Sequence, residues 1–472
     1  MQTGFTPAQL ADPELATSEQ ILRKCVHCGF CTATCPTYVL LGDELDSPRG
    51  RIYLIKDMLE NARPATDAVV PHIDRCLSCL ACMTACPSGV HYQHLIDHAR
   101  VHVERTYRRP LRERVLRALL AAILPYPRRL RAALSLGALA RPLVRRWASN
   151  HPAHPARAAG GASAGGFAAS LRAMLQLAAA ATRREPAPEA ARRAPADGDE
   201  GGAPLGRRGR VALLSGCAQS VLDSGTQAAS VRLLERAGFD VVAIDGCCGA
   251  LVHHLGRAAD GAAFATRILE RIEAERRRGA IDAVIVTASG CGTHLKDYGH
   301  LFRTDAQRAG VAAAMSARTR DITEWLHEIG WSAATAPARA TSAWTHQGLS
   351  VAYHSACSMQ HGQQLDRAPR ELLERAGFEV REIPEGQLCC GSAGTYNLLQ
   401  PEIATQLRDR KVESIRRTGA RLVATGNVGC IIQLASASEL PVVHTAELLD
   451  WACGGPMPAT LRARTEWFPP RR

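Results

Sequence analysis

Two runs of cysteines carry the clearest chemical signal in the 472-residue sequence, and both follow the pattern C-x2-C-x2-C-x3-C-P. This spacing is typical of proteins that hold two [4Fe–4S] clusters, in which the fourth cysteine of each run ligates the cluster of the other run. Three thiolates spaced in this way can wrap one face of a cubane cluster in a single tight loop. The pattern therefore predicts two cluster sites, one formed by Cys25, Cys28, Cys31 and Cys86, the other by Cys76, Cys79, Cys82 and Cys35.

Two other uses of these cysteines fit the sequence less well. Structural zinc sites pair separate C-x2-C or histidine-containing halves and do not use triplets of cysteines. A disulfide framework predicts dispersed cysteines in a small secreted chain. This chain is long, and we find no secretory signal at its start. We therefore expect a cytoplasmic protein that keeps its 17 cysteines reduced and transfers electrons.

The two runs predict a first domain, an α-helical ferredoxin-like unit over residues 1–105. Between the runs, Ser47 precedes Pro48, which favours a helix start, and the apolar spacing that follows is helical. We therefore expect helices inserted between the cluster loops. Arg49 and Arg51 lie at this helix start. They could raise the reduction potential of a nearby cluster, dock an acidic partner, or simply face solvent.

The next two segments have biased compositions. Residues 106–147 interleave arginines with apolar residues, and much of the net charge of +12 comes from arginine. Basic amphipathic helices suit an anionic membrane surface; the alternative is a helical hairpin packed on the next domain with its arginines in water. Residues 148–208 are rich in Ala, Gly, Pro and Arg, which predicts a flexible linker with one short helix near Phe167–Thr182. We find no uncharged apolar window long enough for a spanning helix.

An internal repeat organises the rest of the chain. The sequence Leu-Leu-Glu-Arg-Ala-Gly-Phe occurs at 233–239 and again at 372–378, and cysteines recur at the same offset of about 140 residues. In each copy a β-rich run ends at a cysteine, a helix follows, and further strands come next. Alternating strands and helices predict a duplicated α/β domain with a parallel sheet, over residues 209–335 and 336–472. The whole chain is thus expected to be a multidomain α+β and α/β protein.

The cysteines of each copy follow its strands. In open parallel sheets, the loops at the carboxyl ends of the strands gather ligands at one edge. We therefore expect four cysteines per copy to converge on one metal site. The two predicted sets are Cys217, Cys247, Cys248 and Cys291 in the first copy, and Cys357, Cys389, Cys390 and Cys430 in the second.

The Cys…Cys-Cys-Gly…Cys arrangement resembles the cysteine-rich (CCG) domain of heterodisulfide reductases. Its combination with an N-terminal double-cluster unit is similar to the iron–sulfur subunits of bacterial glycolate oxidases, and the similarity includes residues 47–53 and 425–430. The resemblance implies a hetero-oligomer in which FAD-containing subunits oxidise glycolate to glyoxylate. This chain would then pass the electrons to a quinone or similar acceptor. The equivalent subunits of lactate or anaerobic glycerol-3-phosphate dehydrogenases and of heterodisulfide-reductase-like complexes are alternatives.

The chain departs from the heterodisulfide reductases at one position of each copy. There a C-x2-C pair helps to hold an unusual cluster, whereas here Ala288 and Asn427 stand where the first cysteine of that pair would be. Four thiolates still suffice for an ordinary iron–sulfur cluster or a zinc ion, and counting ligands does not separate these from an empty site. A zinc-bearing assembly scaffold is therefore the second class of function left open.

No dinucleotide fingerprint, P-loop or nucleophile elbow is found in the sequence, so we expect no catalytic residue for substrate oxidation in this chain and no nucleic-acid partner. Cys453 is expected to be a plain buried thiol. Peripheral attachment to the inner face of the cell membrane is the alternative to a purely cytoplasmic location. Five histidines near the cysteine motifs are read as polar loop residues in preference to ligands or hydrogen-bond donors; they are His253, His254, His294, His354 and His361.

Overall fold

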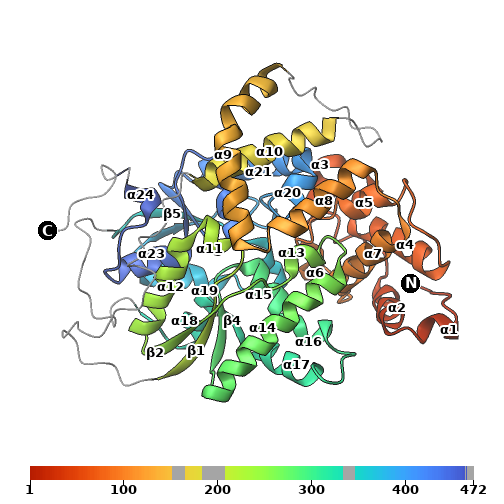
Figure 1. Ribbon diagram of the computed structural model, residues 1–472, viewed down its shortest axis with the longest axis horizontal. Coiled ribbons are helices and arrows are strands. Elements are labelled where there is room, and N and C mark those ends of the chain that lie inside the picture. Colours follow the sequence, from red (N-terminus) through yellow and green to blue (C-terminus); the bar gives the residue numbers. More distant parts are fainter. Residues whose placement is uncertain (151–164, 183–207, 333–345, 463, 465–472) are drawn as a thin grey trace.

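The architecture is described from a computed structural model, which gives the placement of residues 1–150, 165–182, 208–332, 346–462 and 464 (Figure 1). A helical N-terminal region, drawn in red and orange, lies beside two α/β units drawn from green to blue. The expected fold class, an α-helical N-terminal part followed by duplicated α/β units with parallel sheets, is confirmed. Most of the segment expected to be a linker lies outside the described residues.

The N-terminal region consists of short helices with well-defined starts. They are α1 (Pro7–Leu10), α2 (Pro13–Lys24), α3 (Pro36–Leu41), the 3-10 turn η1 (Glu44–Asp46), α4 (Pro48–Glu60), α5 (Val70–Asp74), α6 (Ala81–Thr84) and α7 (Tyr92–Thr106). As expected, α4 begins after Ser47, whose hydroxyl accepts a hydrogen bond from the Gly50 amide at 3.0 Å, with Pro48 at the first helical position. Helices α3, α4 and α5 separate the two cysteine runs, and α4 and α7 supply much of the apolar core between them.

Three longer helices follow this region. They are α8 (Leu111–Ile123), α9 (Pro127–Asn150) and α10 (Gly165–Thr182). The expectation that the arginines of this segment face water or lipid is wrong for Arg109 and Arg117. Their guanidinium groups lie 2.6 and 3.0 Å from the Asp74 carboxylate, in an acidic cluster that also contains Glu104 and Glu113. Among the described helices, none has both the length and the apolar character needed to cross a membrane.

Helix α10 occupies the place where one short helix was expected within the low-complexity segment. It is not merely part of a connection, because Ala180 and Ala181 are buried against Ala288, Val428 and Ile432 of the two α/β units. The sequence concealed this role, since alanines pack closely without giving a strong apolar signal. The remainder of the expected linker, 151–164 and 183–207, lies outside the described residues.

The two α/β units, here called repeat 1 (208–332) and repeat 2 (346–462), each contain a four-stranded parallel sheet. The strands of repeat 1 are β1 (Gly209–Leu214), β2 (Phe239–Ile244), β3 (Ala283–Val286) and β4 (Thr319–Asp321), in the order β2-β1-β3-β4. Those of repeat 2 are β5 (Ser350–Tyr353), β6 (Glu379–Arg381), β7 (Leu422–Thr425) and β8 (Val442–His444), in the order β6-β5-β7-β8. The registers also correspond, since Val211 pairs with Val241 and Val351 pairs with Val380.

Helices cover both sheets. In repeat 1 they are α11 (Gln219–Leu222), α12 (Ser224–Arg236), α13 (Ala250–His253), α14 (Ala258–Arg278), α15 (Ser289–Lys296), α16 (Tyr298–Leu301), α17 (Ala309–Arg318) and α18 (Ile322–Glu328). In repeat 2 they are the π-helical turn η4 (Ser358–Gly362), α19 (Arg367–Arg375), α20 (Tyr396–Leu399), α21 (Pro401–Arg416), α22 (Val428–Ala435), α23 (Thr445–Ala452) and α24 (Ala459–Arg462).

The two repeats share one hydrophobic core. Helix α12 of repeat 1 packs on α23 of repeat 2, and α18 of repeat 1 packs on α19 of repeat 2. Because α12 corresponds to α19 and α18 to α23, the two contacts are related by an approximate two-fold axis. Leu233 of repeat 1 and Leu372 of repeat 2, from the repeated heptapeptide, are both fully buried in this core. At its edge the buried Asp450 carboxylate pairs with Arg232 at 2.6 Å and Arg236 at 2.8 Å. This packing fixes the two sheet edges, and the cysteines on them, relative to each other.

Candidate metal centres

The structure brings the sixteen motif cysteines into four groups. The first centre is Cys25, Cys28, Cys31 and Cys86, the second is Cys35, Cys76, Cys79 and Cys82, the repeat-1 centre is Cys217, Cys247, Cys248 and Cys291, and the repeat-2 centre is Cys357, Cys389, Cys390 and Cys430. None of these sixteen cysteines forms a disulfide. Cys453 lies apart from these groups in the shared core, where burial raises the pKa of its thiol to about 12.

The first centre lies at the protein surface. Its four cysteines line one cavity that encloses about 430 Å³ of space, part of it open to solvent. Cys28 is exposed, and the neighbouring side chains of Val26 and Phe30 are 67% and 66% exposed. Cys86 comes from the other cysteine run, as the exchange of fourth ligands requires. A cluster held here would therefore lie within reach of a partner's surface.

The cysteine loops use backbone conformations that turn amide groups toward sulfur. His27 and Ser78 occupy the same position in the two loops and both have positive φ, 55° and 49°. The turn at Ser78 places its amide 3.5 Å from the Cys76 sulfur, to which it donates a hydrogen bond. Hydrogen bonds to the sulfurs are one of the means by which proteins set the reduction potential of a cluster. The two loops thus suit anionic, metal-bound thiolates.

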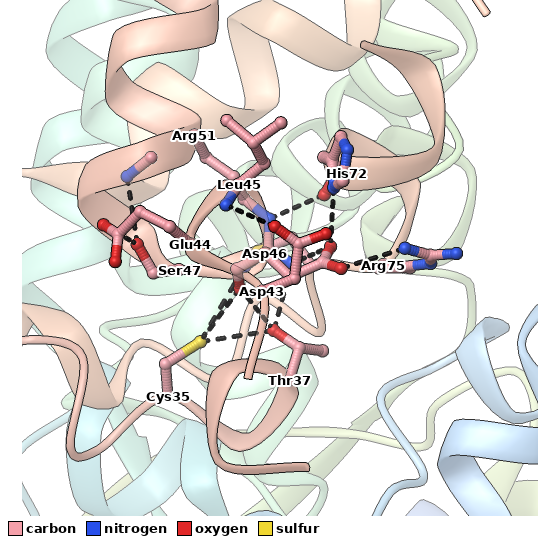
Figure 2. A network of polar contacts seen from close by, with 12 residues as sticks. Cys35, Thr37, Asp43, Glu44, Leu45, Asp46, Ser47, Arg51, His72 and Arg75 are labelled. Carbon is pink, nitrogen blue, oxygen red and sulfur yellow. Dashed lines mark hydrogen bonds and ion pairs between the residues drawn. The ribbon is translucent and has the colours of Figure 1, made fainter. Parts of the chain in front are cut away.

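The second centre is buried and adjoins a polar network around Asp46, which Figure 2 shows in close-up. The Asp46 carboxylate pairs with Arg51 at 3.2 Å, Arg75 at 2.9 Å and His72 at 3.1 Å. Burial alone would raise the pKa of Asp46, but these three partners hold it below its ordinary value. Arg51 also lies beside the cluster cysteine, with its Nη1 3.8 Å from the Cys35 sulfur.

The network decides between the three interpretations of the arginines at the start of α4. Arg51 is 1% exposed and lies against a motif cysteine, so it neither faces solvent nor docks a partner. Its positive charge would stabilise an anionic, reduced cluster at the second centre. Arg49 instead lies nearer the surface, where its Nε is 2.6 Å from the Glu44 carboxylate. Sequence reasoning weighed the two arginines equally, because the burial of Arg51 depends on tertiary contacts with Asp46.

Two further side chains contact the second centre, and sequence reasoning missed both. The Tyr92 hydroxyl lies 3.8 Å from the Cys76 sulfur. Arg100 donates to the Cys76 carbonyl at 2.7 Å and to the Ser78 hydroxyl at 2.6 Å, which holds the loop in place. Both side chains project from α7, whose helical spacing of apolar residues gave no sign of a role near sulfur.

In repeat 1 the four cysteines follow β1, β2 and β3, and their sulfurs form a continuous chain of contacts. Cys217 hydrogen-bonds Cys247, Cys247 is next to Cys248, and the Cys248 sulfur lies 3.3 Å from the Cys291 sulfur. The neighbouring Cys247 thiol and burial raise the pKa of Cys217 well above its ordinary value. Bare thiolates are therefore unfavourable here, and a bound cation would supply the missing positive charge.

Repeat 2 repeats this arrangement at the ends of β5, β6 and β7. The Cys357 and Cys389 sulfurs are 3.7 Å apart, and those of Cys390 and Cys430 are 3.3 Å apart. Cys389 and Cys390 are in contact, so the four thiols again form one group. The Asn427 amide donates to the Cys430 sulfur at 3.4 Å. Asn427 thus contributes a hydrogen bond where the heterodisulfide reductases carry a further cysteine.

The glycine of each Cys-Cys-Gly motif has a structural reason. Gly249 and Gly391 adopt φ of 93° and 84°, and each donates its amide to the first cysteine of its motif at 3.4 Å. A Cβ at either position would lie 2.5 Å from a carbonyl oxygen, that of Gly261 or Ala404. Only glycine combines this conformation with this close approach.

The second centre and the repeat-2 centre lie next to each other. Cys79 packs against Cys389, Tyr396 and Leu407 in one buried apolar cluster. Burial, together with the neighbouring thiols of Cys357 and Cys35, raises the pKa of Cys79 well above its ordinary value. The Thr84 hydroxyl and the His361 Nδ1, 2.9 Å apart, connect the same surfaces. Two cysteine groups that are far apart in the sequence therefore share one protein interior.

The histidines near the motifs have separate surroundings. His361 bridges Thr84 and the Gln387 carbonyl, so it connects the N-terminal region with repeat 2. His253 and His254 both lie 3.5 Å from the Asp97 carboxylate on α7. His294 is buried within α15, and His354 is buried in the loop after β5, at 5% and 2% exposure. These contacts and this burial depend on tertiary structure and could not be predicted from the local sequence.

Comparison with known proteins agrees with this geometry. Residues 24–90 match the family described as "4Fe-4S dicluster domain", and residues 211–296 and 351–435 match "Cysteine-rich domain". The chain is 38% identical over 454 residues to the "Glycolate oxidase iron-sulfur subunit" of Escherichia coli, covering 96% of this chain and 99% of that protein. The chain belongs to the family of glycolate oxidase iron–sulfur subunits. The family places it among iron–sulfur oxidoreductase components that work within a multi-subunit complex.

Other relatives extend the comparison. The "Probable glycolate oxidase iron-sulfur subunit" of Bacillus subtilis is 31% identical over 452 residues, which cover 92% of this chain and 94% of the relative. "Lactate utilization protein A" of the same organism is 26% identical over 255 residues, covering 51% of this chain and 99% of that protein. The family match confirms that the chain resembles glycolate oxidase iron–sulfur subunits over nearly its full length.

Proposed function

We propose that this chain is the electron-transfer subunit of a glycolate oxidase complex. FAD-containing partner subunits would oxidise glycolate to glyoxylate, and this chain would carry the electrons to a quinone or similar acceptor. Two [4Fe–4S] clusters, when bound, supply one-electron carriers, and the first and second centres would hold them through the eight cysteines of the two runs. The observation that carries the proposal is the continuity of cysteine groups from the exposed first centre to the buried repeat-2 centre.

The protein's own side chains support this role. Cys28, Val26 and Phe30 give a partner access to the first centre. Arg51 offers a buried positive charge beside Cys35, which favours the uptake of an electron at the second centre. Burial of the second centre excludes water, and so limits side reactions with solvent-borne oxidants.

The repeats are proposed to hold further centres through their four cysteines each, as iron–sulfur clusters or zinc ions. Each set of four cysteines fits either an iron–sulfur cluster or a zinc ion, because both are bound by thiolates at one compact site. We propose the domain division 1–105, 106–147, 148–208, 209–335 and 336–472 on the same basis. The matched segments 24–90, 211–296 and 351–435 each fall within one of these units, which supports the division.

The decisive experiment is spectroscopic. The anaerobically purified chain should be brown, contain eight or more irons, and lose visible absorbance on reduction. In complex with its flavoprotein partners, addition of glycolate should bleach the same bands, whereas D- or L-lactate and glycerol 3-phosphate should not. Bleaching by lactate alone would favour the lactate branch of the relatives. A colourless protein that contains only zinc would contradict electron transfer and favour the assembly scaffold.

Single cysteine variants sharpen this test. Cys28→Ser and Cys79→Ser should each remove one cluster and stop electron flow to the quinone, while glycolate oxidation with an artificial flavin oxidant continues. The matched control is Cys453→Ser, which lies in the shared core away from the four centres. Unchanged quinone reduction in both cluster variants would reject the electron path.

We also propose that α8 attaches the complex to an anionic membrane surface. Leu111, Val115 and Leu119 are 72%, 49% and 51% exposed and recur every four residues, so they form one apolar stripe. Exposed arginines flank this stripe, at Arg112 and Arg114. The triple variant Leu111→Ser/Val115→Ser/Leu119→Ser should release the complex from vesicles that contain anionic lipid without loss of iron. Wild-type protein that fails to bind such vesicles at low salt would contradict this attachment.

A further inference from the structure

The repeat-2 centre contains a potential ligand that is not a cysteine. His354 follows β5 directly, and one of its ring nitrogens lies within 4.8 Å of the sulfurs of both Cys390 and Cys430, which are likewise within that distance of each other. All three residues are buried, at 2%, 1% and 2% exposure. Two donors bound to one metal ion at ordinary zinc–nitrogen and zinc–sulfur lengths lie about 3.5 Å apart. The three atoms therefore need only small shifts to share one ion.

The imidazole has a buried nitrogen that nothing else accounts for. The backbone amide of His354 donates to the Ala424 carbonyl at 2.8 Å, which fixes the residue at the edge between β5 and β7. Its Nε2, however, has no hydrogen-bond partner among the described residues. An unpaired buried polar atom costs about 1–3 kcal/mol, so such atoms in folded proteins usually have a ligand, an ion or a water as partner. Here the potential partners close by are the thiols of Cys390 and Cys430.

We propose that His354 is a metal ligand of the repeat-2 centre, where its Nε2 binds the same transition-metal ion as the Cys390 and Cys430 sulfurs. The inference deepens the proposed function and rests on its assignment of the repeat-2 cysteines. The shared chemistry is that of a borderline-soft ion which accepts one imidazole together with thiolates, either zinc or an iron of an iron–sulfur cluster. Cys357 and Cys389, 3.7 Å apart, complete the donor set on the side that faces Cys79.

Repeat 1 provides the internal contrast that makes this ligand specific to repeat 2. The residue equivalent to His354, three positions before the first motif cysteine, is Leu214, which is 2% exposed in the apolar core behind Cys248. Among the described residues, no histidine forms such a group with the repeat-1 cysteines. In Rieske centres, where neutral imidazoles stand in place of thiolates, the reduction potential is higher. If iron occupies repeat 2, an imidazole ligand from His354 would act in the same direction. The repeat-2 centre would then attract electrons from the adjacent second centre.

The first test needs no mutation. The full-length chain is purified anaerobically from cells grown with ¹⁵N-histidine, and its metal content is measured. If iron occupies repeat 2, pulsed electron paramagnetic resonance of the reduced protein should detect a directly coordinated ¹⁵N. If zinc occupies it, absorption at the zinc edge should give one nitrogen at about 2.0 Å and sulfurs at about 2.3 Å. A sulfur-only shell for both metals would overturn the proposal.

Variants then identify the nitrogen. His354→Leu, which copies repeat 1, should abolish the nitrogen signal, whereas His354→Cys should restore metal content with an all-sulfur shell. His254→Gln, a histidine variant outside the centre, should leave the signal unchanged. A nitrogen signal that persists in His354→Leu would overturn the assignment. If Cys390→Ser and Cys430→Ser change neither iron nor zinc content, the repeat-2 centre itself is refuted, which is a separate failure from that of the histidine.

Discussion

The two repeats are close copies that surround equivalent cysteines with different chemistry. Both present four thiols at the ends of three parallel strands, and both use a left-handed glycine to direct an amide at the first cysteine of the Cys-Cys pair. Around the repeat-2 thiols lie three polar side chains, His354, Lys411 and Asn427. At the same places repeat 1 has apolar residues, among them Leu214 and Ala288.

The repeats also meet the N-terminal region in different ways. Repeat 1 meets α7 through polar groups, with His253 and His254 near Asp97 and with the His94 Nε2 2.8 Å from Asp297. Repeat 2 meets it through a buried apolar cluster in which Cys79 itself packs against Cys389. A conserved scaffold with divergent surroundings implies divided roles. On the proposed function, repeat 2 would exchange electrons with the second centre, whereas repeat 1 would mainly anchor the helical region.

The largest expected effect follows directly from this division. Cys430→Ser should reduce electron transfer from the flavoprotein to quinone by roughly 100-fold or more, since even residues behind metal ligands commonly cost 10- to 100-fold. The equivalent change in repeat 1, Cys291→Ser, should cost much less. Steady-state quinone reduction by the reconstituted complex measures both. Reduction of an artificial dye at the flavin serves as the control, and equal losses in the two variants would remove the functional distinction between the repeats.

The next effect should be the same in both repeats. Gly391→Ala and Gly249→Ala each force a Cβ against a carbonyl oxygen, at a backbone conformation that costs about 1–3 kcal/mol for a residue other than glycine. Each variant should therefore lower the thermal midpoint and lose the metal of its own repeat only. Metal analysis and differential scanning calorimetry check this expectation. Gly290→Ala, where the added methyl meets open space, is the matched control.

Much of this architecture could be predicted from the sequence, because motif spacing and internal repetition are local properties. The strands that follow the repeated heptapeptide in each copy and the helix start at Pro48 are found where they were expected. The short edge strands β4 and β8 were not anticipated, since three residues carry no periodicity. Contacts across domains were also missed, such as that of Cys79 with repeat 2, because nothing in the sequence states which surfaces meet.

A moderate effect is expected at Lys411, which is buried with its ammonium 2.7 Å from the Glu385 carbonyl and close to the thiols of repeat 2. Burial lowers the pKa of Lys411, while Cys390 and Cys389 raise it. Lys411→Met removes a positive charge and should lower the reduction potential of the repeat-2 centre, slowing quinone reduction by roughly tenfold at most. Redox titration checks this shift. Lys296→Met, at an ion pair of repeat 1, should leave that potential unchanged.

The smallest expected effect tests the polar anchor of repeat 1. Burial would lower the pKa of His253, but Asp97 raises it above the ordinary value of 6.5. The pair therefore stabilises the fold fully below pH 6.5 and loses this contribution as the pH rises through the raised pKa. Asp97→Asn should remove this dependence, at a cost on the order of 1 kcal/mol at pH 6. Thermal unfolding between pH 6 and pH 9 measures it.

The apolar anchor of repeat 2 supplies the control for this pH dependence. The Tyr396 hydroxyl donates to the Arg75 carbonyl at 3.1 Å, a bond that involves no group titrating between pH 6 and pH 9. Tyr396→Phe should therefore lower the thermal midpoint by the same amount at every pH in this range. If Asp97→Asn behaves in the same uniform way, the histidine–carboxylate pair does not link repeat 1 to the helical region by charge. The stability of both attachments to the N-terminal region would then be independent of pH, and the two repeats would differ only in the surroundings of their cysteines.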